Sequence, residues 1–597
     1  MENRRFSRAM SFGISDEALV CVMAYIDDPR DRDAVSQVCR KWYNIDARTR
    51  KHITIALCYS TMPARLRMRF LGLESLKLKG KPRAAMFNLN LIPEDWGGYV
   101  GPWVNEISKG FNCLKSLHFR RMIVRDADLE VLVRSHGHML QALKLDKCSG
   151  FSTDGLLQVT QSCRCLRTLF LEESSIFEKD GDWLHELAVN NNVLETLNFY
   201  MTELKFINTK DLELIAKNCR SLLSLKISDC EILDLCGFFR AALTLVEFGG
   251  GSFNDETGDL DKYSSVSFPP NLCRMGLNYM GKNEMPILFP RASLLKKLDL
   301  QYTFLDTEDH CQLIQRCPNL EVLEVRNVIG DSGLEILARN CKRLRRLRIE
   351  CGEDEQDEQG MVSQRGLATL AQGCPDLEYL AVYVSDIANS ALESIGTFSK
   401  NLTDFRLVLL DKEKTITELP LDNGVRALLT GCQKLRRFAL YLRQGGLSDI
   451  GLGYLGKYSD NIRWMLLGFV GCSDAGLLEF SKGCPSLQKL EIRGCCFSER
   501  ALALAVLQLR SLRYIWVQGY NASKTGSDLL AMIRPYWNIE FIPQRQAIVY
   551  DEFGSPAEVD RVERPAQILA YYSLAGRRMD YPETVIPLYP FPLSLGV

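Results

Sequence analysis

Long apolar runs are absent from this 597-residue sequence. No stretch approaches the eighteen or so uninterrupted apolar residues that a membrane span needs, and the N-terminus lacks the apolar core of a secretory signal. Acidic and basic side chains nearly balance, 74 against 73, which disfavours a general role in binding nucleic acids or membrane surfaces. We therefore expect a soluble protein, and 21 cysteines without a signal sequence indicate a reducing compartment.

Signatures of catalysis are also missing. The sequence has no glycine-rich phosphate loop, no His-Glu-x-x-His and no paired Cys-x-x-Cys set at zinc spacing. Its six histidines are scattered, and His185-Glu186 resembles an ordinary helix surface. The sequence therefore nominates no catalytic residue and no metal ligand, and an enzyme stays an open alternative at this point.

What the sequence does contain is a repeat of the form Leu-x-x-Leu-x-(apolar). Most intervals fall between 23 and 28 residues, the period of leucine-rich repeats, in which one short strand is followed by a return segment that is usually helical. The first apolar residue of each copy, its anchor, is Leu73, Leu114, Leu140, Leu166, Leu194, Leu222, Leu245, Leu272, Leu295, Leu320, Leu344, Leu377, Leu402, Leu435, Ile462, Leu487, Leu512 or Ile539. These eighteen copies predict an α/β leucine-rich-repeat solenoid over residues 61–545, shaped as a horseshoe or a closed ring.

Two details fit this architecture. Return helices are predicted where apolar residues recur at helical spacing, as in 212–216 and 333–338. Seven copies place a cysteine three residues before the anchor, which indicates a buried packing residue rather than a reactive thiol. These cysteines are Cys163, Cys219, Cys317, Cys341, Cys374, Cys432 and Cys484.

The N-terminal region does not fit the repeat. After a flexible stretch over 1–12, residues 13–60 predict an all-helical domain with two short amphipathic helices and a third from Ala47 to Leu57. The apolar faces of the first two helices are Leu19, Val22, Met23 and Ile26, then Val35, Val38, Cys39 and Trp42. One interpretation is a cap that covers the first repeat. The other is a docking module, because residues 31–42 resemble the signature of the F-box, which binds the adaptor of a cullin ligase.

At the other end, residues 546–597 predict a cap and tail without chemistry, in which 568–575 forms a last helix. Three intervals are unusually long and predict loops near 79–98, 351–364 and 411–423. Insertions in a rigid array often build a site.

Strand residues four and six places after each anchor should share the concave face. Those positions are basic in some copies and aromatic or apolar in others. Cations gathered on one wall repel one another unless an anion lies among them, which indicates a polyanion site. The alternative is that each cation pairs with a carboxylate of the same wall, such as Asp146, Glu172, Glu324 or Glu350.

Several long segments, among them 76–87, 145–151, 283–290, 405–410, 436–443 and 495–500, strongly resemble the coronatine-insensitive F-box proteins, which are plant jasmonate receptors. The resemblance implies a non-catalytic subunit of an SCF ubiquitin ligase with a Skp-type adaptor and cullin as partners. It further implies jasmonoyl-isoleucine as ligand, inositol polyphosphate as cofactor, and jasmonate ZIM-domain repressors as substrates in jasmonate signalling and plant defence. The expected location is the nucleus, with the cytoplasm as a second location.

The resemblance also assigns site residues. Hormone contacts are expected from Arg83, Ala84, Phe87, Leu89, Arg348, Tyr383, Arg406, Val408, Tyr441, Leu466, Arg493 and Trp516. Polyphosphate or degron contacts are expected from Lys79, Lys81, His118, Arg121, Arg346 and Lys489. Adaptor contacts are expected from Leu19, Val22, Met23, Ile26, Val35, Val38 and Trp42. Two rival functions stay open at this point: an auxin-receptor-like F-box protein and a hormone-independent protein-binding scaffold.

Overall fold

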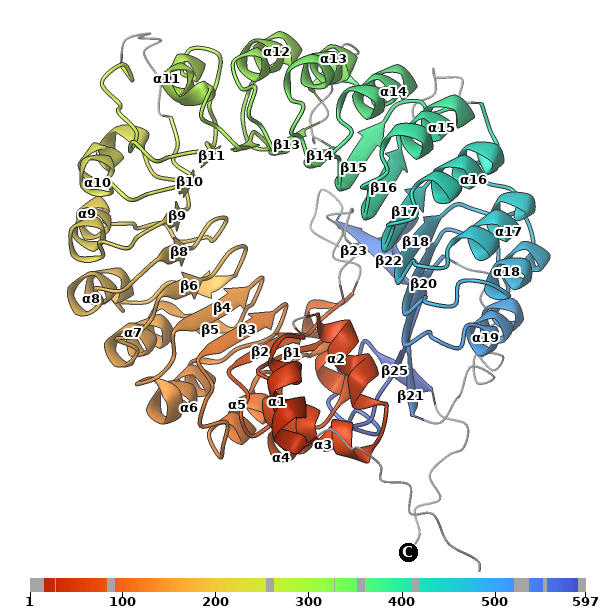
Figure 1. The fold of residues 1–597 in the computed structure, drawn as a ribbon, viewed down its shortest axis with the longest axis horizontal. Helices are drawn as coiled ribbons and strands as arrows, with labels where there is room; N and C mark the ends of the chain where they lie inside the picture. Colours follow the sequence, from red (N-terminus) through yellow and green to blue (C-terminus); the bar gives the residue numbers. More distant parts are fainter. Residues whose placement is uncertain are drawn as a thin grey trace, which may run out of the picture.

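The computed structural model describes residues 15–26, 28–82, 92–253, 262–326, 328–351, 360–410, 418–519, 536–550 and 556–588. They form a nearly closed ring in which strands line the inside and helices the outside (Figure 1). The N-terminal helices lie where the two ends of the ring meet.

A continuous parallel sheet lines the ring, and each strand pairs with that of the neighbouring repeat. Its strands are β1 (His52–Ile55), β2 (Ser75–Lys79), β3 (Ser116–Arg120), β4 (Ala142–Asp146), β6 (Thr168–Phe170), β8 (Thr196–Asn198), β9 (Ser224–Lys226), β10 (Glu247–Gly249), β11 (Arg274–Gly276), β12 (Lys297–Asp299), β13 (Val322–Arg326), β14 (Arg346–Glu350), β15 (Tyr379–Val384), β16 (Asp404–Leu409), β17 (Arg437–Tyr441), β18 (Trp464–Gly468), β19 (Lys489–Arg493) and β20 (Tyr514–Gln518). Two short strands, β5 (Phe151–Ser152) and β7 (Ile176–Phe177), pair separately.

Helices cover the outer side of this sheet. They are α4 (Pro63–Arg69), α5 (Gly101–Ile107), α6 (Asp126–His136), α7 (Thr153–Ser162), α8 (Trp183–Asn190), α9 (Thr209–Asn218), α10 (Cys236–Ala241), α11 (Phe289–Ala292), α12 (Thr307–Gln315), α13 (Gly330–Asn340), α14 (Gln364–Gly373), α15 (Asn389–Phe398), α16 (Asp422–Gly431), α17 (Asp449–Tyr458), α18 (Asp474–Ser481) and α19 (Glu499–Gln508). The return helices predicted from periodicity are confirmed as parts of α9 and α13.

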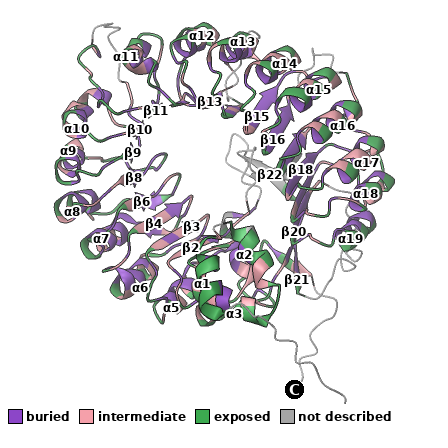
Figure 2. Cartoon of the chain, viewed as in Figure 1, coloured by how far each residue is buried: buried purple, intermediate pink, exposed green. Residues whose placement is uncertain are grey.

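The core lies between the strands and the helices (Figure 2). All eighteen predicted anchors are buried, with at most 2% of their surface exposed. Alternation within each strand explains this burial, since Leu76 and Leu78 point into the core while their neighbours on β2 face the ring interior. The seven repeat cysteines are also buried, and the thiol of Cys341 donates to the carbonyl of Cys317 at 3.4 Å. Their predicted packing role is confirmed.

The N-terminal domain consists of α1 (Asp16–Ala24), α2 (Pro29–Ser36) and α3 (Arg40–Thr49). The predicted second helix is therefore split: the chain breaks at extended Cys39, so Val35 and Trp42 lie on different helices that pack on the same core. The predicted helix from Ala47 to Leu57 is wrong. Residues 52–55 form β1, where β-branched side chains suit a strand that pairs with β2.

The C-terminal end also differs from expectation. Residues 568–575 do not form a helix: the continuous apolar run belongs to β24 (Gln567–Tyr572), which is buried on both faces. The last predicted repeat, at Ile539, lies in β21 (Trp537–Ile542), which pairs antiparallel with β24 and with β25 (Ile586–Leu588). The parallel array therefore ends at β20. A separate hairpin comprises β22 (Arg545–Tyr550) and β23 (Pro556–Arg564).

Over the described ranges, no helix combines the length and the apolar character needed to cross a membrane.

Candidate ligand-binding site

In-register pairing of the strands places equivalent concave residues side by side around the ring. The residues four places after the anchors form one continuous row: Lys77, His118, Lys144, Phe170, Asn198, Lys226, Gly249, Gly276, Asp299, Glu324, Arg348, Ala381, Arg406, Ala439, Leu466, Glu491 and Trp516. The row is basic on the early strands, acidic near β12 and β13, and mixed cationic and apolar from β14 onward.

A cavity of about 360 Å³ lies inside the ring between the early strands β2–β4 and the late strands β14–β20. Eight lysines and arginines but only three glutamates line it. The lining residues are Ala56, Leu57, Lys79, Gly80, Pro82, Arg120, Arg121, Lys147, Glu173, Gln301, Tyr302, Arg348, Glu350, Tyr379, Arg406, Arg437, Trp464, Lys489, Glu491 and Tyr514. The excess of positive charge favours an anionic guest.

Several of these cations have carboxylate partners. Arg406 binds Asp404 through two hydrogen bonds of 2.8 Å, and both side chains are nearly buried. Arg348 pairs with Glu350. On the opposite wall Asp146 accepts from His118 and approaches Arg120, each at 3.2 Å. The pairing alternative raised by the sequence is therefore correct for these side chains.

Two lysines behave differently. Within the described part of the chain, Lys79 and Lys489 form no ion pair. Burial, reinforced by the positive charges of Lys489, Lys77, Arg120 and Arg121, lowers the pKa of Lys79 to about 7. Burial likewise lowers the pKa of Lys489 to about 8, and its ammonium group lies 5.0 Å from the ring centre of Tyr514. Both groups would gain from a bound anion.

An apolar cluster adjoins the cationic cavity on β15–β18. It consists of Ala381, Tyr383, Val408, Ala439, Trp464 and Leu466, with Tyr379, Leu410 and Tyr441 packed against it. Burial raises the pKa of the Tyr383 phenol, so this hydroxyl stays protonated. Nearby, the Arg493 guanidinium lies 4.9 Å from the ring centre of Trp516. The combination suits a largely apolar molecule with one anionic group.

The structure thus brings together most of the predicted site. Lys79, Arg121, Arg348, Arg406 and Lys489 line the cavity. Val408, Leu466, Tyr383 and Tyr441 lie in or against the apolar cluster. Lys81 contributes through its backbone, because its carbonyl accepts from Arg121 Nε at 2.7 Å. Arg346 stacks over Tyr379 at 4.4 Å. Arg83, Ala84, Phe87 and Leu89 lie outside the described residues.

Several lining residues are not among those predicted from the sequence. Tyr379, Arg437, Trp464 and Tyr514 all stand two places after an anchor. Positions i, i+2 and i+4 of a strand share one face, so these residues point into the ring together with the positions that were considered. The same periodicity would have found them.

The predicted adaptor contacts divide into two groups. Leu19 and Met23 are 2% and 1% exposed and form the core of the helical domain with Ile45. Ile26, Val35 and Trp42 pack against that core. Val22 and Val38, by contrast, are 50% and 65% exposed. The two exposed valines are therefore accessible to a partner, while the buried residues hold the helices together.

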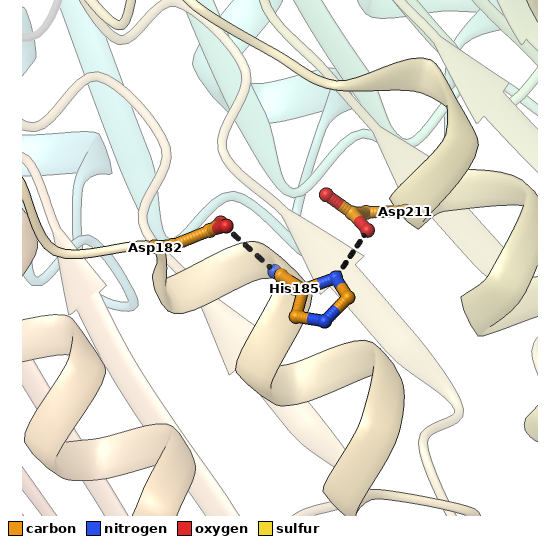
Figure 3. A group of neighbouring side chains, drawn as sticks. All are labelled: Asp182, His185 and Asp211. Atoms are coloured by element: carbon orange, nitrogen blue, oxygen red, sulfur yellow. Dashed lines mark hydrogen bonds and ion pairs between the residues drawn. The ribbon is translucent and has the colours of Figure 1, made fainter.

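Asp182, His185 and Asp211 gather on the helical outside of the ring (Figure 3). Asp182 caps α8 by accepting from the backbone nitrogen of His185 at 3.3 Å. His185 Nδ1 lies 2.8 Å from Asp211 Oδ1 on α9, and this carboxylate raises the pKa of the imidazole. Capping and an ion pair between neighbouring repeats account for these contacts, and we assign the group a structural role.

Comparison with known families agrees with the geometry. Residues 11–52 match the F-box, and residues 71–119 match the transport inhibitor response 1 protein domain. The helical domain and the strand-lined ring together define an F-box protein with a leucine-rich-repeat solenoid.

Full-length relatives are more specific. Coronatine-insensitive protein 1 of Arabidopsis thaliana is 65% identical over 573 residues, which cover 96% of each chain. Coronatine-insensitive protein homolog 1a of Oryza sativa subsp. indica is 64% identical over 596 residues, or 99% of each chain. GRR1-like protein 1 of Arabidopsis thaliana is 33% identical over 592 residues, or 98% of each chain. The chain belongs to the coronatine-insensitive protein family, which confirms the resemblance found in the sequence.

Proposed function

We propose that this chain selects substrates for an SCF-type cullin ubiquitin ligase and is a co-receptor for jasmonoyl-isoleucine. The F-box match and the high identity to coronatine-insensitive proteins support this proposal. The helices α1–α3 recruit a Skp-type adaptor and cullin. The ring captures a jasmonate ZIM-domain repressor, which is then ubiquitylated and degraded in jasmonate signalling and defence. The chain performs no bond chemistry itself, and it acts in the nucleus.

The observation that carries the proposal is the apolar cluster on β15–β18 beside a cationic cavity. In the proposed complex Arg348 and Arg406 hold the carboxylate and amide oxygens of the hormone. Their present partners do not prevent this, because a guanidinium has five donors and Arg406 uses two nitrogens to bind Asp404. Val408 and Leu466 contact the apolar part of the hormone.

We place an inositol polyphosphate in the cationic cavity next to the hormone. Lys79 and Lys489 face this space from opposite walls, and Arg121 lies beside Lys79 on the same wall. Phosphate groups would offset the mutual repulsion of these cations. Hormone and repressor then complete one buried site together, so each tightens the binding of the other by the same factor.

A capture experiment tests the proposal. Purified chain with its adaptor is incubated with immobilised repressor peptide, with and without jasmonoyl-isoleucine. We expect hormone-dependent capture, which Arg406→Ala abolishes while adaptor binding is retained. Val38→Asp, at an exposed position of the F-box, should give the opposite pattern. Val189→Asp, equally exposed on α8, is the matched control and should change neither interaction.

The two rival functions give different results in the same assay. Capture that is equal with and without hormone would indicate a scaffold. Competition by auxin rather than by jasmonoyl-isoleucine would indicate an auxin-receptor-like protein. Either result would contradict the proposed ligand.

A further inference from the structure

Among the described residues, the two edge strands of the sheet do not pair with each other. Strand β1 pairs only with β2, and β25 pairs only with β21. The two ends of the ring nevertheless lie side by side (Figure 1). The backbone nitrogen of Leu574 donates to the carbonyl of Ser60 at 2.8 Å, and further contacts come from side chains. We call the group that joins them the clasp: Tyr59 and Trp96 from the start of the ring, and Glu540, Arg578 and Asp580 from its end.

Arg578 is the centre of the clasp. Its side chain is 1% exposed and binds Glu540 at 3.3 Å and Asp580 at 2.8 Å. The guanidinium also donates to the backbone carbonyl of Trp96. Its central carbon lies 4.2 Å from the ring centre of Tyr59 and 4.4 Å from that of Trp96. One buried cation therefore joins segments that are almost five hundred residues apart in the sequence.

The remaining members of the clasp bind one another. Trp96 Nε1 donates to Glu540 at 2.6 Å, and the Tyr59 hydroxyl donates to Asp580 at 2.5 Å. The Tyr59 hydroxyl oxygen accepts from the backbone nitrogen of Gly98 at 2.7 Å. Every charged group of the clasp thus has an opposite charge or a hydrogen-bond partner, as buried charges require.

The glycines of the Trp96-Gly97-Gly98 segment make this approach possible. Gly97 has a φ of +112°, and a Cβ placed there would lie 2.3 Å from Arg578 Nη2. Gly98 packs directly on the end of β2: a Cβ there would be 3.4 Å from Gly80 Cα and 3.5 Å from Lys81 N. The segment therefore transmits the position of Arg578 to the backbone that follows Lys79.

The clasp touches the cationic cavity on both sides. Gly80 lines the cavity at the early wall. Trp96 also packs in an apolar cluster with Leu57, Tyr514 and Trp516, and of these Leu57 and Tyr514 line the cavity. The clasp is therefore a direct link between the early wall (β2–β4) and the late wall (β14–β20), beside the hydrogen bonds that Leu574 and Ser573 donate to the carbonyls of Ser60 and Tyr59. The hydrogen-bonded sheet joins these walls only by the long path around the ring.

We propose that Arg578 is a positioning residue for the cavity. By joining the two ends of the ring, it holds the early wall (β2–β4) and the late wall (β14–β20) at a separation that suits an anion bound by both walls. This inference rests on the proposed function, which supplies the polyphosphate. A preorganised cavity does not spend binding energy on bringing Lys79 and Lys489 into place. Without the clasp, each wall keeps its cations, but the walls lose the buried link that holds their spacing next to the cavity.

The test compares Arg578→Gln with Arg577→Gln, a neighbouring exposed arginine. Binding of inositol hexakisphosphate alone to the full chain with its adaptor is measured by calorimetry, at a temperature well below unfolding of both variants. We expect affinity to fall by about tenfold or more in Arg578→Gln and to stay within about twofold in Arg577→Gln. Hydrogen exchange at residues 79–82 and 95–99 should accelerate only in Arg578→Gln.

Two further variants keep the test decisive if Arg578→Gln does not fold. Tyr59→Phe removes only the hydroxyl, and with it the two hydrogen bonds to Asp580 and Gly98, and should weaken binding by about twofold or more. Gly97→Ala places a Cβ against the Arg578 guanidinium and should lower the affinity as Arg578→Gln does. Gly453→Ala, where the nearest atom to a new Cβ is 3.5 Å away, is its control.

The outcomes are distinguishable. Unaltered affinity in folded Arg578→Gln and Tyr59→Phe, even with a lowered melting temperature, would mean that the clasp only stabilises the fold and would overturn the inference. If the unmodified chain does not bind inositol hexakisphosphate, the proposed polyphosphate site itself fails.

Discussion

Binding of a polyanion to this cavity should depend on pH in a defined direction. Burial and neighbouring cations hold the pKa of Lys79 near 7, and burial holds that of Lys489 near 8, against an ordinary value of 10.5. Near neutral pH both lysines of the empty cavity are therefore partly deprotonated. An anion bound between them restores their charge, so binding takes up protons. The affinity for the anion should be highest below pH 7 and should fall as the pH rises through the lowered pKa values of Lys79 and Lys489.

The size of the effect follows from proton linkage. Each lysine that must gain a proton lowers the association constant by up to tenfold per pH unit above its pKa. From pH 7 to pH 9, Lys79 contributes up to about a hundredfold and Lys489 up to about tenfold. Residual exposure of both ammonium groups reduces these limits. We expect a total fall of at least about tenfold and at most about a thousandfold.

The assay needs a ligand whose own charge is constant. Inositol hexasulfate meets this condition because sulfate esters stay ionised over the range, whereas phosphates do not. Calorimetry at pH 6, 7, 8 and 9 in buffers of different ionisation enthalpy gives both the affinity and the number of protons taken up. Lys79→Arg should flatten the profile, because arginine keeps its charge. Lys457→Arg, exposed on α17, is the control. An affinity that is constant or rises with pH would refute the reasoning.

Two predictions concern stability. Leu347→Ala, at a fully buried position of β14, should lower the free energy of unfolding by about 2–5 kcal/mol. Leu243→Ala, at a position that is 57% exposed, should change it by less than about 0.5 kcal/mol. Denaturant titration measures both values, and equal effects would contradict the assigned core. Asp46→Asn removes a fully buried carboxylate that contacts Arg32 at 3.3 Å and should cost about 3–5 kcal/mol, seen as loss of the F-box transition in calorimetry. Asp16→Asn, in an exposed pair with Lys41, should cost less than about 1 kcal/mol.

The repeat architecture was predictable because one periodic signal is repeated many times. Each anchor, such as Leu344, is buried by the same local alternation. An error in assigning one copy therefore does not change the predicted fold. The ends were not predictable in this way. The runs 52–55 and 567–572 carry no repeat partner, and whether they form helix or strand depends on which sheet edge is available.

The site could be predicted only in part for a similar reason. Strand alternation places Arg348 and Arg406 on the inner wall without knowledge of their partners. It does not show that Asp404 is close enough to bind Arg406 twice, or that Lys79 and Lys489 line the same cavity from opposite walls. That proximity depends on how the two ends of the ring meet, and nothing in the local sequence around Lys79 encodes the distance to β19.

Register also explains how charged and apolar side chains are arranged on the late wall, which consists of β14–β20. Successive inward residues of a strand are about 6.6 Å apart, so positions two, four and six form three layers across β14–β20. The first layer holds Arg437 and Lys489 beside Tyr379, Trp464 and Tyr514, and the second holds Arg348 and Arg406. The third holds Tyr383, Val408 and Tyr441 beside Glu350 and Arg493. A guest that extends along the strands therefore meets cations in all three layers, which span about 13 Å. In the proposed complex the polyanion would therefore lie in the first layer beside Lys489, and the hormone would lie in the second and third layers, where Arg406 adjoins Val408 and Tyr441.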